Sequence, residues 1–372
     1  MSLKLGSKTI NAFYTSVSST KIVPTGVFDI PSRSGTYNVK NYAFARADFP
    51  DDLVKRLDGT LTSYSNSSIT SIGPFAFAGL DITSVSIPAV TQIGSSAFRE
   101  CSSLTSINLP ACTYINPSAF ASCIQLTSVN IPQCSRITAG AFQNCTNLTN
   151  ISLSTSVSLA GGTFSNCTAL SSFPFSRITY LGDYEFYNTA LTGNISLAST
   201  ITSLGTNTFG FTQITSIYGP NIQSLHATRT FDSCSQLVSA IFPNCSFLSG
   251  YGLFEYCTSL SNVSLPECVA IAGTDTFAHC TSLSTINLPK CSTLGTTAFY
   301  NCSNLQSISL PSCITIGNTA FQSCHKLKSI FLPVCTTLGY STFMSCDQLS
   351  SVKMPMVSYI PNSCFRYCTS LM

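Results

Sequence analysis

Residues 104–123 read L-T-S-I-N-L-P-A-C-T-Y-I-N-P-S-A-F-A-S-C, and lightly altered copies of this stretch follow one another along most of the chain. Each copy places a phenylalanine three residues before its last position. Successive phenylalanines are 21, 22 or 23 residues apart, at Phe77, Phe98, Phe120, Phe142, Phe164, Phe186, Phe209, Phe231, Phe254, Phe277, Phe299, Phe321, Phe343 and Phe365. A short period of this kind predicts a stack of similar units, each of which contacts only its neighbours.

One copy also predicts its own local structure. Leu104, Ile107 and Leu109 point one way and the polar residues between them point the other, as in a short strand. Pro110 ends that strand because proline has no amide hydrogen to donate. A tight turn at 117–120 returns the chain to the interior. We therefore predict a leucine-rich-repeat solenoid: a β-rich, right-handed stack of parallel strands, with about fourteen turns of 22–23 residues and short turns or 3-10 segments on the other side.

The 19 cysteines follow the repeat rather than a disulfide pattern. Eleven lie three residues after the anchor phenylalanine, and seven more follow the proline that ends the strand. Free cysteine is among the most buried residue types. We therefore expect a ladder of reduced, buried thiols. The alternative is that a few disulfide bridges join neighbouring turns. The chain has no C-x-x-C pair, which argues against a zinc site, and nothing in it suggests a cofactor.

Residues 1–60 lack the period and are predicted to form a small N-terminal α/β cap or attachment region. Residues 8–14 and 37–45 alternate enough for short strands, and 49–59 predicts one short helix. The solenoid is expected over 61–372. It should be irregular at 171–230, where the pattern loosens and aromatic residues cluster.

Composition and the two ends of the chain limit the possible partners. Only 8% of residues are charged, and the net charge of +3 is too small to argue for nucleic acid or an anionic membrane. No apolar run is long enough to span a bilayer, and no signal peptide is visible. No polar cap follows the last copy, so self-association through an uncapped C-terminal end is expected to be possible.

The repeat L-x-x-I-x-L-P-x-C-x-x-I-x-x-x-A-F-x-x-C resembles the BspA-like leucine-rich repeats of bacterial surface proteins over about 61–372. Residues 171–230 depart from that pattern. The resemblance implies adhesion or ligand binding outside the cell, with no catalysis. Two short N-terminal stretches, K-L-G-S-K-T-I-N and G-T-Y-N-V-K-N-Y-A, look like segments of phage and prophage tail-associated proteins.

Three pairs of residues could in principle carry chemistry. His279 and His325 each adjoin a cysteine, and Asp183 lies two residues from Glu185. Neighbouring side chains point different ways, and a narrow solenoid has no deep cleft, so neither a thiol nucleophile nor a carboxylate pair is expected. We therefore predict that the chain is not an enzyme.

The outward positions of the strands are the better candidates for binding. They form two columns of small polar side chains, which either solvate the sheet or dock an extended protein or glycan. Aromatic residues in the irregular arc either repack it or form a binding zone. The candidate residues are Ser106, Asn108, Ser128, Asn130, Asn262, Asn287, Ser309, Phe331, Lys353, Tyr180, Tyr184 and Tyr187.

These features predict a non-enzymatic binding or adhesion protein on a bacterial surface or phage virion, which presents its repeats to a host-cell, glycan or protein partner. The alternative is a purely structural spacer or fibre component of a phage or prophage particle.

Overall fold

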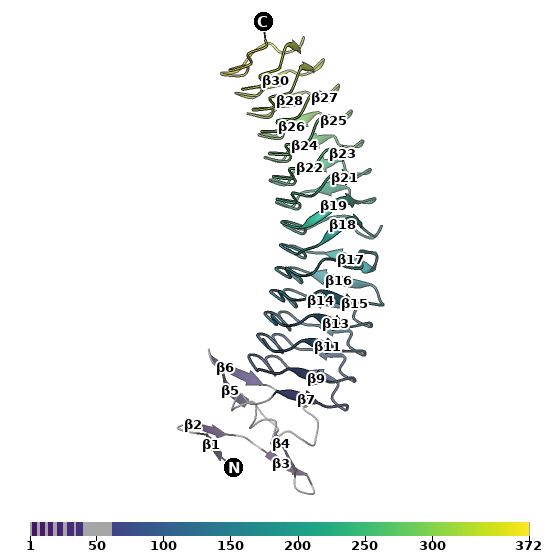
Figure 1. The fold of residues 1–372 in the computed structure, drawn as a ribbon, viewed down its shortest axis with the longest axis vertical. Coiled ribbons are helices and arrows are strands. Elements are labelled where there is room, and N and C mark those ends of the chain that lie inside the picture. The colour runs from purple at the N-terminus through teal and green to yellow at the C-terminus, as the bar shows by residue number, and fades with distance from the viewer. Residues whose placement is uncertain are drawn as a thin grey trace. The chain divides into compact units, whose positions relative to one another are not determined.

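The computed structural model describes residues 62–371 in full and, before them, the backbone of six strands (Figure 1). These six pair as antiparallel hairpins: β1 (Ser2–Leu5) with β2 (Lys8–Asn11), β3 (Tyr14–Val17) with β4 (Lys21–Pro24), and β5 (Phe28–Ser32) with β6 (Gly35–Val39). Strand β2 lies within the stretch predicted at 8–14, and β6 overlaps the start of the one at 37–45. The helix predicted at 49–59 lies outside the described residues.

The chain divides into two units, Met1–Arg177 and Ile178–Met372. In each unit one coil supplies a front strand of about three residues and a shorter return strand. The front strands of the first unit are β7 (Ser63–Ser65), β9 (Ser84–Ser86), β11 (Ser106–Asn108), β13 (Ser128–Asn130) and β15 (Asn150–Ser152). Its return strands are β8 (Ser71–Ile72), β10 (Gln92–Ile93), β12 (Tyr114–Ile115), β14 (Arg136–Thr138) and β16 (Val157–Ala160). One 3-10 turn, η1 (Phe175–Arg177), ends this unit.

The second unit repeats this arrangement. Its front strands are β18 (Thr192–Ser196), β19 (Gln213–Tyr218), β21 (Ser239–Ile241), β23 (Asn262–Ser264), β25 (Thr285–Asn287), β27 (Ser307–Ser309), β29 (Ser329–Phe331) and β31 (Ser351–Lys353). Its return strands are β17 (Ile178–Leu181), β20 (Ser224–Leu225), β22 (Phe247–Leu248), β24 (Ala270–Ile271), β26 (Thr293–Leu294), β28 (Thr315–Ile316) and β30 (Thr337–Leu338).

The strand pairings between consecutive coils inside a unit are parallel, and all but that of β18 with β19 keep one register, as in Ser106 with Ser128 and Asn108 with Asn130. Strands β18 and β19 are longer than the others, and a bulge between Gly193 and Asn194 shifts their register. Both units are therefore parallel β-solenoids, as the period predicts. No helix in the described part of the chain is long and apolar enough to cross a membrane.

The anchor phenylalanines form a continuous ring ladder inside each unit. From Phe77 to Phe164, successive rings are 4.9 to 5.6 Å apart between centroids and within 3° of parallel. From Phe186 to Phe365 the spacings are 5.0 to 5.9 Å, with interplanar angles of at most 11°. These values are typical of offset stacking, which is favoured over face-to-face contact. The strict sequence period thus places identical side chains one above another.

All 19 cysteines are buried and free, which confirms the predicted burial of the thiols. The cysteine after each phenylalanine donates its S–H to a carbonyl of the preceding coil, as in Cys145 Sγ to the oxygen of Phe120 at 3.1 Å. The cysteines that follow the strand-ending proline contact a carbonyl of their own coil. For example, Cys291 Sγ lies 3.2 Å from the carbonyl oxygen of Thr293. Burial raises the pKa of Cys112 and Cys245 to about 11, so these thiols are protonated at neutral pH.

Each coil also closes through two residues with positive φ, one on each side of the anchor phenylalanine. In the coil of Phe120 they are Ser118 (φ 56°) and Ser122 (φ 61°). Small polar residues and glycine tolerate this left-handed conformation, whereas bulky side chains are uncommon there. The second position nonetheless holds Tyr256 (φ 59°) and His279 (φ 61°) in successive coils. The tight turn is therefore fixed by packing of the whole stack rather than by local preference.

Candidate partner-binding surface

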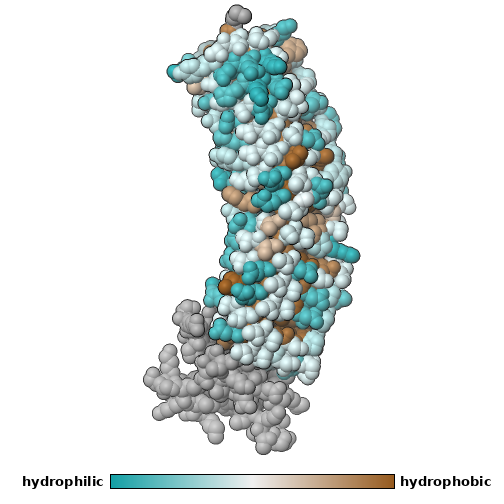
Figure 2. Space-filling view, viewed as in Figure 1, coloured by the Kyte–Doolittle hydropathy of each residue, from teal (hydrophilic) through white to brown (hydrophobic). Residues whose placement is uncertain are grey.

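The front strands hold every second side chain toward solvent, and we call this side of each unit the front face. On β11 the pattern is exposed, buried, exposed, because Ile107 lies in the core while Ser106 and Asn108 point outward. Of the predicted front-face residues, Ser128 is half-buried and the others are exposed: Ser106, Asn108, Asn130, Asn262, Asn287, Ser309, Phe331 and Lys353. Figure 2 shows a surface mostly of intermediate hydropathy with separate hydrophilic and hydrophobic spots, consistent with its small polar residues.

Part of the polar column pairs with itself. Asn130 Nδ2 donates to Asn108 Oδ1 at 2.8 Å, and Asn262 Nδ2 donates to Ser239 Oγ at 2.9 Å. Each of these bonds joins one coil to the next along the front face. An asparagine whose NH₂ group already donates to a neighbouring coil has fewer donors left for a ligand. These hydrogen bonds are therefore better suited to holding coils together than to binding a partner.

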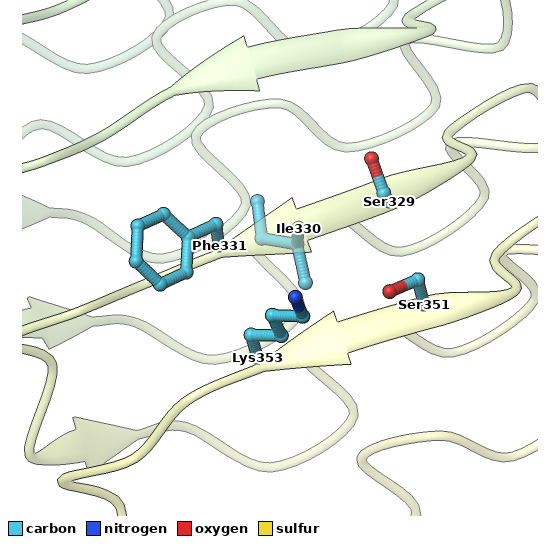
Figure 3. Close-up of a pocket in the computed structure, with 5 residues that line it drawn as sticks. All are labelled: Ser329, Ile330, Phe331, Ser351 and Lys353. Carbon is cyan, nitrogen blue, oxygen red and sulfur yellow. The ribbon is translucent and has the colours of Figure 1, made fainter.

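The front face changes character at β29 and β31. Phe331 is directly paired with Lys353, and Ser329 with Ser351. Phe331 is 58% exposed, which is a high value for a large apolar side chain. The two pairs and Ile330 line a shallow depression of about 300 Å³ (Figure 3). The ring and the lysine lie at one end of this depression and the two hydroxyls at the other. We call these five residues the 331/353 patch.

In the described part of the chain, the side-chain polar groups of the 331/353 patch make no hydrogen bond or ion pair with the rest of the fold. Within residues 62–371, no side-chain hydrogen bond involves Ser329 or Ser351, and no ion pair involves Lys353. By contrast, the exposed Lys290 Nζ lies 2.6 Å from Glu267 Oε2 of the preceding coil. Hydroxyls and an ammonium beside an exposed ring could bind a partner without first breaking a contact of the fold.

The three candidate tyrosines of the irregular arc do not form one site. Tyr180 on β17 is 53% exposed and lines a depression of about 350 Å³ together with His226 and Asp183. Tyr184 and Tyr187 do not line it. Their rings lie 5.7 Å apart in an edge-to-face arrangement, and Tyr187 makes a similar contact with Phe211. The three tyrosines are therefore close in sequence, but Tyr180 lies apart from the contact between Tyr184 and Tyr187.

The repeats of this chain match a known family. The model of the BspA type leucine rich repeat region, in six copies, matches residues 70–192, 158–251 and 248–372. The chain belongs to the BspA-type leucine-rich-repeat family. Its members are typically protein-interaction or surface proteins, are usually surface-exposed, and are generally non-enzymatic. No sequence among curated proteins matches this one.

Solved structures show the same fold. A leucine-rich repeat protein from Bacteroides ovatus is 25% identical, with a TM-score of 0.63, and the match covers 93% of this chain and 98% of the other. A leucine-rich repeat protein from Eubacterium ventriosum is 18% identical, with a TM-score of 0.51, and the match covers 91% and 95% of the two chains. The second similarity shows the fold alone.

Against this BspA-type framework, the residues considered for chemistry have structural roles. Glu185 is buried, and its Oε1 accepts a hydrogen bond from the amide of Gly182 at 3.1 Å. Asp183 Oδ1 accepts from the amide of Thr206 at 2.6 Å. Cys280, next to His279, is fully buried, and burial raises the pKa of its thiol well above the ordinary value. Among residues 62–371, no group of three or more histidine, cysteine or acidic side chains could hold a metal ion.

Two clusters on the turns of the second unit were not predicted. Tyr256 stacks on His279 with centroids 4.4 Å apart, and His279 meets Tyr300 edge to face at 5.3 Å. Burial lowers the pKa of His279. Nearby in sequence, Arg229 lies over the ring of Tyr251 and within 4 Å of Glu255. The sequence signal was available, because Tyr256 and His279 both occupy the position before the core cysteine.

Proposed function

We propose that this chain is a non-enzymatic binding protein, displayed on a bacterial surface or a phage virion, that contacts its partner through the 331/353 patch. The supporting observation is the direct pairing of an exposed Phe331 with a Lys353 that makes no ion pair in the described part of the chain. Elsewhere on the front face, polar side chains form hydrogen bonds with each other, as Asn130 Nδ2 does with Asn108 Oδ1. Aromatic residues such as Phe331 are enriched at protein interfaces, and polar groups such as Lys353 and the two hydroxyls fit the solvent-accessible rim around them.

Attachment of fluorescently labelled protein to intact animal and bacterial cells tests this proposal. The double variant F331A/K353A should bind at least about tenfold more weakly than the parent, because interface energy concentrates in a few residues. The matched control is N108A/N130A, which also alters one register pair of the front face. Both variants should retain the parent's circular dichroism.

Unchanged attachment of folded F331A/K353A would overturn the proposal. The structural role, a spacer or fibre component of a phage or prophage particle, would then be favoured. That role needs the repeats but no particular front-face side chain.

A further inference from the structure

We propose that the ligand of the 331/353 patch is an acidic polypeptide segment, which places a carboxylate against Lys353 and an apolar side chain on Phe331. This inference rests on the proposed function and adds the chemistry of the partner. It is carried by the local charge, by the geometry of the paired strands and by the absence of an internal counter-ion within the described residues.

The charge at this end of the second unit is one-sided. Residues 303–372 contain Lys326, Lys328, Lys353 and Arg366 but a single acidic residue, Asp347, so four positive charges minus one leave +3. This equals the formal net charge of all 372 residues. Residues 61–302 carry five basic and eight acidic side chains, a net charge of −3, so within the repeats the positive excess lies in the coils at the C-terminal end.

The one carboxylate of these coils is already engaged. Asp347 Oδ2 lies 2.8 Å from His325 Nδ1. Lys328 directly precedes Ser329 of the patch, and it is exposed, as is Lys353. Like charges on neighbouring coils repel weakly in water, and an anionic partner relieves this repulsion as it binds. Charge complementarity thus favours a negatively charged ligand over a neutral or basic one.

The geometry favours a polypeptide. Phe331 and Lys353 lie on adjacent parallel strands, about 4.8 Å apart, and each is two residues from a serine on its own strand. An extended peptide also presents alternate side chains on one face, about 6.5–7 Å apart. An acidic segment with interspersed apolar residues can therefore meet the lysine, the ring and the hydroxyls together. Family members typically engage in protein interactions, which agrees with this choice.

Random copolymers test the chemistry directly. The full chain is titrated into labelled poly(Glu,Tyr) and the fluorescence anisotropy is followed, with poly(Glu), poly(Lys,Tyr) and polygalacturonate as comparison probes. We expect poly(Glu,Tyr) to bind best and poly(Lys,Tyr) not to bind. Raising the salt from about 50 to 300 mM should weaken binding, because exposed charges are screened.

Matched variants separate the patch from general charge. K353A and F331A should each weaken poly(Glu,Tyr) binding about five- to tenfold, as for other interface truncations. K290A removes the same charge from a lysine outside the patch and should leave binding within about twofold. Equal loss in K290A and K353A would show non-specific attraction and overturn the inference.

Three other results would also overturn it. They are failure of poly(Glu,Tyr) to bind, equal binding of poly(Lys,Tyr), or tighter K353-dependent binding of polygalacturonate, which would assign an acidic glycan instead. If F331A/K353A loses attachment to cells while poly(Glu,Tyr) fails to bind the parent, the patch remains the contact surface and only the ligand class is wrong.

Discussion

Cys123 Sγ lies 3.0 Å from the carbonyl oxygen of Phe98, one coil earlier, and donates a hydrogen bond to it. The thiol therefore does more than fill space, because it satisfies a buried acceptor and links two coils. Where threonine replaces the cysteine, the hydroxyl donates within its own coil, as Thr212 Oγ1 does to the carbonyl oxygen of Phe209 at 2.8 Å, and Thr212 Oγ1 also lies 3.3 Å from Cys234 Sγ of the next coil. Cysteine at this position instead donates to a carbonyl of the preceding coil.

C123A should lower the free energy of unfolding by about 1–3 kcal/mol, because it removes a buried donor and leaves a small cavity. Equilibrium denaturation of C123A beside A121G, a change at a buried residue of the same coil without a side-chain donor, measures the effect. Full stability of C123A would mean that the thiol contact contributes nothing.

The thiols also predict a loss of stability in alkali. Burial raises the pKa of Cys112 to about 11 and that of Cys123 to about 12, from an ordinary value of 9.0. Below pH 9 these thiols are protonated in both states, so their contribution to stability is fully present. Above pH 9 the unfolded chain releases protons that the folded chain retains, and stability falls until the folded thiols ionise.

The midpoint of guanidinium unfolding should therefore decrease steadily from pH 9 to pH 11. A thiol reagent should react slowly with the native chain at pH 8. In denaturant, where the thiols are exposed, it should react with all 19 cysteines. Rapid native reaction of most thiols would contradict their burial.

F120A should lower the free energy of unfolding by about 3–5 kcal/mol, as for other truncations of buried phenylalanines. Its ring stacks on those of Phe98 and Phe142, so amide hydrogen exchange should rise most between residues 98 and 142. The control is F331A, which removes an exposed ring and should change stability by less than about 0.5 kcal/mol. Uniform acceleration along the chain in F120A would contradict nearest-neighbour coupling.

R229A should destabilise the second unit by about 1–3 kcal/mol at pH 7, because Asp232 and Glu255 would lose the guanidinium that lies 3.7 and 3.9 Å away. Burial raises the pKa of both carboxyls. The folded state therefore favours the neutral forms of these two carboxyls. As the pH rises above their ordinary pKa values, they lower the free energy of unfolding.

The effect of R229A should accordingly shrink when unfolding is measured near pH 4, where protonated carboxyls no longer need a cation. R99A, which removes an exposed partner of Glu100, should change stability by less than about 0.5 kcal/mol at either pH. An effect of R229A that grows on acidification would contradict the assignment.

The core of this protein could be predicted because the repeat determines it. An inward residue such as Phe120 or Cys123 recurs with the period, and stacking then follows without further information. The pairing of Asn130 with Asn108 could not be predicted. An exposed asparagine can face solvent or its neighbour equally well, and only the register and the spacing of the strands decide between them.

The same distinction applies to the candidate sites. Phe331 and Lys353 were predicted as candidates from the outward positions of their strands, and in-register pairing brings them together. Tyr180 was grouped with Tyr184 by proximity in sequence, yet a return strand and a tight turn separate their surroundings. The stack of Tyr256 on His279 was missed because His279 was considered only beside Cys280, within one coil.

The two positive-φ residues that close each coil have a consequence for how such a gene can change. Because every coil ends with the same turn, the joint between any two coils is interchangeable. Duplication or loss of one whole 22-residue unit would leave each column continuous, whereas gain or loss of half a unit would set front-strand residues against turn residues. The length of the array can therefore vary among descendants in whole coils while its cross-section stays constant.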